Sequence, residues 1–139
     1  MQKIILLLLT LAFTPFAFAD NCPTVASIKS HATAGWKAYD SDDDTPLPSK
    51  RLHAFVKQIE QFALAEWKNN KTHHNTMHCY YRDKNGSALE AYLTKDGFSP
   101  VNNKNRWYKV SGSMHCAAGM DECLFQRKLA TRQTSVTRS

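Results

Sequence analysis

The chain has 139 residues, of which 42% are hydrophobic and 11% aromatic, and its net charge is +6. This length excludes a multidomain machine, the low glycine and proline content excludes a collagen-like chain, and the hydrophobic fraction excludes a wholly disordered one. We therefore expect a single globular domain that builds its own core.

Residues 1–19 have the layout of a secretory signal peptide. Lys3 provides a positive start, a long apolar run follows, and Ala17 and Ala19 are the small residues expected before a cleavage site at Asp20. The apolar run is shorter than the ~20 residues that a membrane-spanning helix needs. We expect secretion by way of the periplasm, with no transmembrane segment in the mature chain.

The mature chain contains four cysteines: Cys22, Cys79, Cys116 and Cys123. In an exported protein their expected state is the disulfide, and four cysteines allow three pairings. Cys116 and Cys123 enclose a short loop that closes readily, which leaves Cys22 to pair with Cys79. The chain has no Cys-x-x-Cys motif, so the cysteines do not indicate redox catalysis.

The first half of the mature chain predicts a short helix or turn, a strand, a loop and an amphipathic helix. Residues 22–29 form the helix or turn, and the alternation of aromatic and polar residues over 35–40 predicts the strand. Residues 41–49 are acidic and contain two prolines, which favours a loop. Apolar residues then recur at helical spacing over 52–63, with Ser49 as the candidate N-cap.

Residues 61–68 fit either the end of this helix or a buried strand, because a short apolar run does not separate the two. Further along, Asn85-Gly86 lies between two aromatic-rich runs and predicts a β-hairpin. Alternation along its first strand places Cys79 and Tyr81 on one face. A polar loop is expected over 96–105.

A third strand is expected over 106–110, and residues 126–139, which are basic, read as a flexible tail. Together the patterns predict an α+β fold in which one amphipathic helix packs on a small antiparallel sheet closed by two disulfides. The predicted organisation is a signal peptide over 1–19, one domain over 20–125 and the tail.

Histidines form the first candidate site. His73, His74 and His78 lie close together in the sequence, and His115 precedes a cysteine. Imidazoles at such spacing can bind zinc or act as general acid and base. The spacing matches no ligand motif, so exposed loop histidines are the first interpretation. The alternatives are a weak zinc site at His73, His74 and His78, and a secreted hydrolase using all four, including a ribonuclease-like use of His78, Arg82 and His115.

The acidic run from Asp40 to Asp44 is a weaker candidate. Its alternating aspartates resemble a calcium loop, but Thr45 and Arg51 stand where an EF-hand needs glycine and glutamate. A solvated loop is therefore expected, with loose calcium binding as the alternative.

Basic and aromatic residues near the C-terminus form the candidate ligand-binding surface. Its members are Lys104, Arg106, Trp107, Tyr108, Lys109, Arg127 and Lys128. Basic side chains attract phosphates, and aromatic ones settle at a lipid interface. We expect an anionic lipid or glycan of a host cell as the partner, and we do not expect nucleic acid.

Four segments also carry a family resemblance: Cys22-Pro23, residues 35–40, the run from Phe62 to Trp67 with His78 to Tyr81, and the C-terminal Cys116 to Phe125. They resemble a family of small exported, cysteine-paired proteins of unknown function from Legionella-type bacteria. The resemblance implies a host-directed factor, because some relatives are type II secretion substrates. It implies no catalytic residues.

The residues and the resemblance together favour a secreted, non-catalytic virulence-type factor. Its expected ligand is anionic, such as a phosphoinositide membrane surface. The small hydrolase or metal-dependent enzyme built on the four histidines is the alternative.

Overall fold

A computed structural model of the chain describes residues 19–101 and 106–128. The predicted signal segment up to residue 18, Lys104 and residues 129–139 of the predicted tail lie outside the described residues. The elements in chain order are α1 (Val25–Lys29), β1 (Lys37–Asp40), α2 (Ser49–Gln58), β2 (Gln61–Lys68), β3 (Thr76–Arg82), β4 (Ala88–Asp96), β5 (Phe98–Pro100), β6 (Tyr108–Val110), β7 (Ser113–Cys116) and β8 (Phe125–Arg127).

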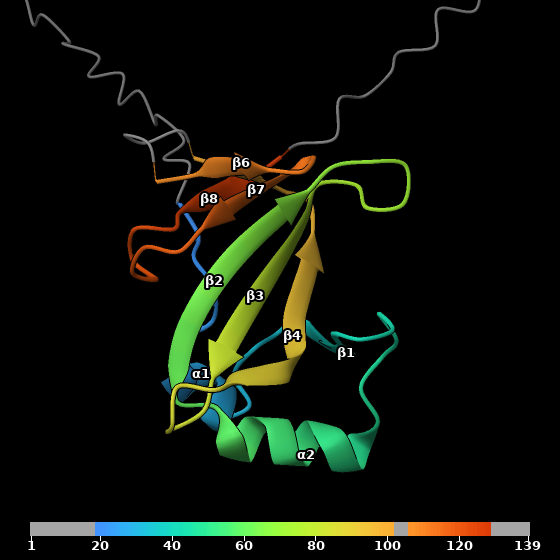
Figure 1. Ribbon diagram of the computed structural model, residues 1–139, viewed down its shortest axis with the longest axis vertical. Helices are drawn as coiled ribbons and strands as arrows, with labels where there is room; N and C mark the ends of the chain where they lie inside the picture. The colour runs from blue at the N-terminus through green and yellow to red at the C-terminus, as the bar shows by residue number, and fades with distance from the viewer. Residues whose placement is uncertain (1–18, 102–105, 129–139) are drawn as a thin grey trace, which may run out of the picture.

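A six-stranded antiparallel sheet with the order β1-β4-β3-β2-β7-β6 organises the fold, and β5 and β8 pair in a second, two-stranded sheet. Figure 1 shows the long strands β2, β3 and β4 curving between β6 and β7 at one end and the two helices at the other. This arrangement confirms the predicted α+β class, with a sheet that is larger than expected. Within the described ranges, no helix is long and apolar enough to cross a membrane.

The amphipathic helix is confirmed, but its predicted N-cap is wrong. It begins one residue earlier than expected: Ser49, the predicted N-cap, is its first residue, and Pro48 is the N-cap and makes no side-chain capping bond. It stops at Gln58 because Ile59 takes up an extended backbone conformation, with φ −67° and ψ 128°. Residues 61–68, which were open between helix and strand, form β2. The apolar residues after Ile59 therefore alternate across a sheet instead of extending the helical stripe.

The predicted hairpin is confirmed between β3 and β4. Asp83 Oδ1 accepts hydrogen bonds from the backbone amides of Asn85 and Ser87, and Gly86 adopts a φ of +77° that favours glycine. Two other boundaries change. The expected loop over 96–105 contains β5, and β8 includes Gln126, which had been assigned to the tail.

The core lies on one face of the large sheet, where α1, α2, β5 and β8 cover it. The buried residues of β3 on this face are Met77, Cys79 and Tyr81, which confirms the predicted sharing of a face by the last two. The Tyr81 hydroxyl donates a hydrogen bond of 2.6 Å to the Pro23 carbonyl. The segment before α1 is thus fixed against the central strand.

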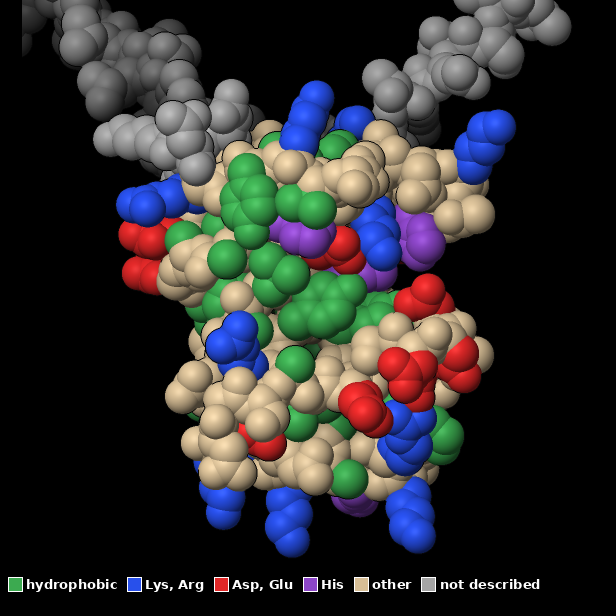
Figure 2. Space-filling view, in the orientation of Figure 1, with side chains coloured by type: hydrophobic (Ala, Val, Ile, Leu, Met, Phe, Trp, Pro, Cys, Tyr) green, Lys and Arg blue, Asp and Glu red, His purple; other side chains and the backbone are tan. Residues whose placement is uncertain are grey.

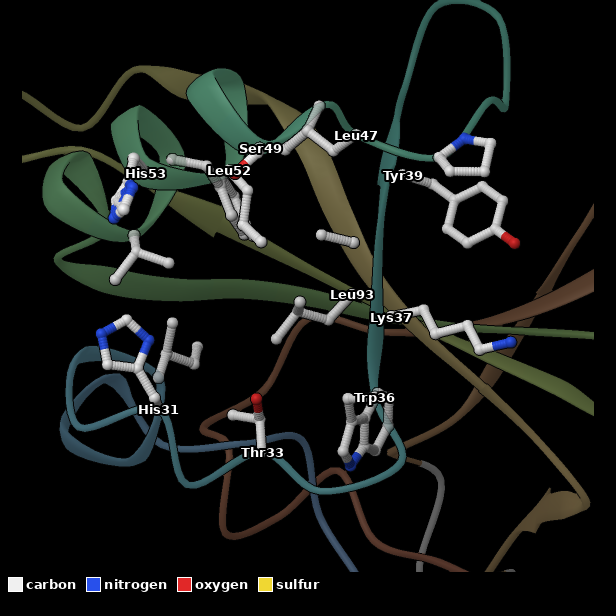
Figure 3. A pocket seen from close by; sticks show the side chains of 15 residues that line it. His31, Thr33, Trp36, Lys37, Tyr39, Leu47, Ser49, Leu52, His53 and Leu93 are labelled. Carbon is white, nitrogen blue, oxygen red and sulfur yellow. The ribbon is translucent and has the colours of Figure 1, made fainter.

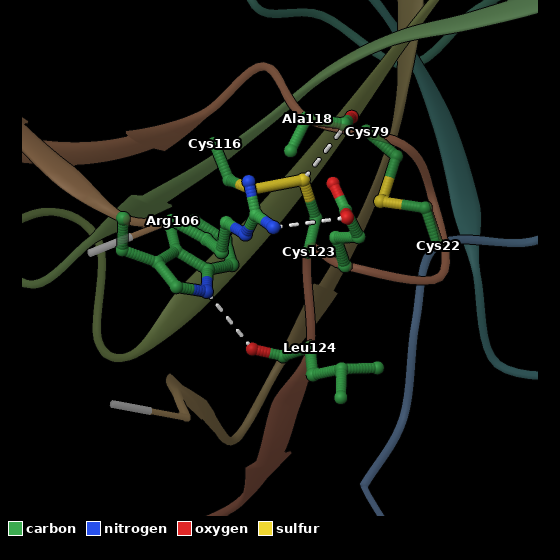
Figure 4. Close-up of a disulfide and its surroundings, with 9 residues drawn as sticks. Cys22, Cys79, Arg106, Cys116, Ala118, Cys123 and Leu124 are labelled. Carbon is green, nitrogen blue, oxygen red and sulfur yellow. Dashed lines mark hydrogen bonds and ion pairs between the residues drawn. A yellow bond between two sulfur atoms is a disulfide. The ribbon is translucent and has the colours of Figure 1, made fainter. Parts of the chain in front are cut away.

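Both predicted disulfides, Cys22–Cys79 and Cys116–Cys123, are present, and no described cysteine is free. The first ties the N-terminal segment to β3, and the second closes the loop that follows β7 (Figure 4). All four cysteines are buried in the core. Each bond therefore combines a covalent constraint with hydrophobic packing.

Removing each disulfide tests this account of stability. In the chain-entropy model, the double variant C22A/C79A should lower the free energy of unfolding by about 4 kcal/mol and C116A/C123A by about 2.5 kcal/mol, because the first bond closes the longer loop. Urea unfolding followed by tryptophan fluorescence would measure both. An equal loss, or a larger loss for the shorter loop, would contradict the expectation.

Candidate functional site

The face of the large sheet opposite the core carries polar and aromatic side chains. Because side chains alternate along a strand and Met77 and Cys79 face the core, Thr76, His78 and Tyr80 point to the other side. Figure 2 shows histidine, acidic and basic side chains gathered in a hollow beside the β6–β7 end of the molecule. This polar face is the first candidate site.

Glu66 of β2 is the centre of the polar face. In register it lies between His78 on β3 and His115 on β7, two residues that are far apart in sequence. Its Oε2 is 2.8 Å from His115 Nε2, and its Oε1 accepts a 3.0 Å hydrogen bond from the Tyr80 hydroxyl. Oε1 is also 3.5 Å from His78 Nδ1 and 3.4 Å from Lys68 Nζ. One carboxylate thus connects three adjacent strands.

The surroundings of Glu66 hold it in the charged state. Burial acts to raise the pKa of its carboxyl group. Hydrogen bonding from His78, the charge of Lys68, and hydrogen bonds from His115 and Tyr80 act in the opposite direction and outweigh burial. The pKa of Glu66 therefore lies well below its ordinary value, while burial and the neighbouring Glu66 charge raise the pKa of Tyr80 and keep its hydroxyl a neutral donor.

The predicted histidine group comes together in space. The rings of His73 and His78 are 5.7 Å apart, and Tyr92 stacks on His78 at 4.4 Å. His73, His74 and His78 line one cavity of about 430 Å³, and His115 is linked to His78 through Glu66. Within residues 19–101 and 106–128, no three His, Cys, Asp or Glu side chains are placed to hold a metal ion together.

Arg82 does not join the histidines. It lies at the far end of β3 and pairs in register with Gln61 and Ala88. Arg82 is four positions along the strand from His78, which is about 13 Å at the usual rise. The ribonuclease-like grouping of His78, Arg82 and His115 is therefore not assembled.

Internal contacts fold the acidic loop around its carboxylates. The Asp42 amide and the Arg51 guanidinium hold the pKa of Asp40 below its ordinary value. Asp43 Oδ1 accepts a hydrogen bond of 3.0 Å from the Thr45 amide, and Asp44 accepts one of 2.7 Å from the Tyr92 hydroxyl. Asp44 is thereby brought to the edge of the histidine cavity.

The predicted basic and aromatic residues do not share one face. Arg106 forms an ion pair of 3.1 Å with Glu122, and the Trp107 indole donates to the Leu124 carbonyl at 3.0 Å (Figure 4). Tyr108 and Lys109 are consecutive in β6 and so point to opposite sides of the sheet. Arg127 and Lys128 are exposed on and after β8 in the smaller sheet.

A second candidate site, which the sequence analysis missed, lies between the helices and β1. It is a cavity of about 680 Å³ whose apolar lining comes from Ile28, Trp36, Ala38, Leu47, Leu52, Phe55, Val56 and Leu93. Figure 3 shows these elements enclosing it, with the stem of Lys37 running away from its interior. The helical stripe of α2 was assigned to core packing, but Leu52 keeps 38% of its surface exposed.

Two histidines mark one end of this apolar cavity. His31, which follows α1, and His53 of α2 lie on the same side of it in Figure 3. A shallow groove continues beyond them, lined by Lys29, Lys57 and the same two histidines. Among the described residues, neither the cavity nor the groove is lined by an aspartate or a glutamate. The mouth is therefore basic, although Lys29 also pairs with Glu60 at 3.5 Å.

No protein-family model matches the chain, and comparisons with curated proteins and with solved structures give no significant match. The function is therefore inferred from the geometry of these two sites.

Neutralising Glu66 tests its role on the polar face. Glu66→Gln should lower the free energy of unfolding by about 2 kcal/mol near neutral pH, because bonds to a charged acceptor are stronger than neutral ones. A carboxylate with a lowered folded-state pKa stabilises the fold above its ordinary pKa and loses that contribution as the pH falls through the folded-state value. The difference from wild type should therefore shrink as the pH drops below 4.5, the ordinary value.

The matched control is Glu60→Gln, because Glu60 is exposed and, among the described residues, pairs only with Lys29. We expect it to change stability little at any pH. Urea unfolding over a pH series would measure both variants. A Glu66→Gln effect that is no larger than the control, or that grows on acidification, would contradict the assignment.

Proposed function

We propose that this chain is a secreted binding protein that takes up an anionic amphiphile of the fatty-acid class in the cavity between α1, α2 and β1. The observation that carries the proposal is the combination of an apolar lining with a mouth that has two histidines and no carboxylate among the described residues. The apolar part would accept an alkyl chain, and the basic end would receive a carboxylate or phosphate head.

The dimensions and energetics of the cavity support such a ligand. Its volume of about 680 Å³ falls in the range typical of small-molecule sites. Each methylene group transferred from water to an apolar surface contributes about 0.8 kcal/mol. An anionic head would lose affinity if it were buried, but His31 and His53 at the mouth allow it to stay near solvent and close to basic groups.

The anionic ligand class agrees with the partner expected from the sequence, but the proposed binding site is the apolar cavity and not the basic and aromatic surface near the C-terminus. At the basic and aromatic surface, Arg106 is already paired with Glu122, and Trp107 uses its indole N–H internally. Neighbouring Tyr108 and Lys109 face opposite ways. The cavity collects its apolar and basic groups around one space, which a lipid-like ligand requires.

Secretion is part of this proposal. Two buried disulfides are compatible with an extracellular protein, since such bonds persist in oxidising compartments. The signal-like segment over 1–19 and the resemblance to exported proteins of Legionella-type bacteria support export through the periplasm. A type II secretion substrate that acts as a host-directed virulence factor would meet anionic lipids at host membranes.

Charge preference at the mouth tests the proposed function. We expect dodecanoate to bind more tightly than its neutral methyl ester or dodecylamine in calorimetric titrations. His53→Glu should weaken dodecanoate binding about tenfold, because it places a like charge at the mouth, and should leave or improve dodecylamine binding. Val56→Trp, which places an indole in the cavity, should weaken all three ligands.

The matched control is Gln58→Glu, which adds the same charge to α2 at a residue that does not line this cavity. It should leave dodecanoate binding unchanged. If the three ligands bind equally, or if His53→Glu and Gln58→Glu have the same effect, the proposed ligand class is wrong. No binding of any of the three would remove the cavity as a lipid site.

Acid–base catalysis on the polar face is the second candidate function. The observation that favours it is the sharing of Glu66 by His78 and His115 beside the cavity that His73 and His74 line. His115, whose side chain is 18% exposed, is the member that a substrate could reach. Turnover in a nuclease and glycosidase panel that His115→Gln abolishes would support this function. Absence of turnover in the wild-type protein would end it.

A further inference from the structure

We propose that the cavity lined by the histidines is a separate binding site for a neutral saccharide. It lies on the polar face of the sheet, where β1, β4 and the loop before β3 meet, and its volume is about 430 Å³. We call it the polar groove. It does not depend on the apolar cavity, although Lys37 and Tyr39 of the edge strand β1 line both.

Stacked rings form one wall of the polar groove. The rings of Tyr39 and Tyr92 lie 6.1 Å apart and nearly parallel, and Tyr92 stacks in turn on His78. Tyr92 and His78 are almost wholly buried, with 3% and 1% of their surface exposed, so their rings are held in place. Tyr92 is stacked between Tyr39 and His78, so Tyr39, the half-buried ring at the end of this row, is the one that can receive the apolar side of a sugar ring, at little cost in side-chain entropy.

Two carboxylates at the polar groove present hydrogen-bond acceptors. Asp44 accepts from the Tyr92 hydroxyl at 2.7 Å, and Asp96 accepts from the Thr76 hydroxyl at 2.8 Å. Both bonds use Oδ1. In the described part of the chain, Oδ2 of neither aspartate has a protein donor. The internal bond at Oδ1 therefore orients each carboxylate, and Oδ2 remains available to accept from a hydroxyl group of a ligand.

Thr94 provides an independent indication of a ligand. Its side-chain oxygen is buried and, among the described residues, has no hydrogen-bond partner, and the residue lines the polar groove. A buried hydroxyl without a partner costs free energy, so most such groups in folded proteins are satisfied. A ligand hydroxyl in the groove would supply the missing partner.

The charges around the polar groove favour a ligand without net charge. Lys37 and Lys95 balance Asp44 and Asp96 among its lining residues. A sugar hydroxyl both donates and accepts, so it can serve ammonium groups, carboxylates and threonine hydroxyls together. A purely anionic or cationic ligand would meet two charges of its own sign.

A saccharide titration followed by NMR tests the proposal on the full mature chain. The probes are maltose, cellobiose and chitobiose, with glucuronate and glucosamine as charged comparators. We expect saturable shifts of Thr94 and Tyr92 signals with at least one neutral disaccharide and weaker effects with the comparators. Asp44→Asn should weaken that binding about tenfold, because it removes a charged acceptor. Asparagine also tolerates the positive φ of 55° at this position.

Asp42→Asn is the matched control, since it makes the same change in the same loop at a residue outside the groove. It should leave saccharide binding intact. Thr94→Val keeps the shape of the side chain and should also weaken binding, without lowering the unfolding temperature. The proposal is overturned if no neutral disaccharide gives saturable binding, or if glucuronate or glucosamine binds as tightly as the neutral disaccharide. It is also overturned if Asp44→Asn and Asp42→Asn change saccharide affinity equally. None of these results bears on dodecanoate binding at the apolar cavity.

Discussion

The Glu66 carboxylate is the interaction on which the polar side of this protein depends. It forms hydrogen bonds or ion pairs with residues of β2, β3 and β7. Its partners His78 and His115 lie on either side of it in register. A buried carboxylate in this position is tolerated only because several donors face it. Its contacts with His78 and Tyr80 hold the two rings in fixed orientations. Removing the carboxylate would leave both rings without this acceptor. That rigidity extends through Tyr92, which stacks on His78, to the edge strand β1.

Alternation along the strands then separates two chemistries. Met77 and Cys79 face the disulfide-bonded core, while His78 and Tyr80 lie on the opposite, polar face of the sheet. At β1 the same rule puts Ala38 toward the apolar cavity, with Lys37 and Tyr39 bordering both spaces. The helices cover only the core face, so the apolar cavity forms where α2 and α1 leave a gap over the sheet.

Much of the fold could be predicted because it depends on local signals. Asn85-Gly86 specifies its hairpin within a few residues, and the short loop between Cys116 and Cys123 makes their pairing the natural one. The end of α2 could not be predicted, because Phe62 continues the helical spacing of the apolar residues although it belongs to β2.

The candidate sites were harder to predict, because they are formed by contacts between segments that are far apart in the sequence. The proximity of His73, His74 and His78 was visible in the sequence, but their link to His115 passes through Glu66, which carried no motif. That link exists only because β7 pairs with β2, and β7 itself had no clear strand pattern. Likewise, Leu52 and Val56 looked like ordinary core residues. Only the placement of α1 and β1 shows that they line a cavity.

The state of Glu66 favours binding over proton transfer as the use of the polar face. A general base needs a pKa near the working pH and a free oxygen aimed at its substrate. The pKa of Glu66 is held low, and both of its oxygens already accept from protein groups. Burial raises the pKa of Tyr92, so its hydroxyl stays protonated, and this hydroxyl already donates to Asp44. These groups resist changing their protonation state, which suits a surface that presents fixed donors and acceptors to a ligand. Catalysis would require His115 to act alone among them, with Glu66 orienting its ring.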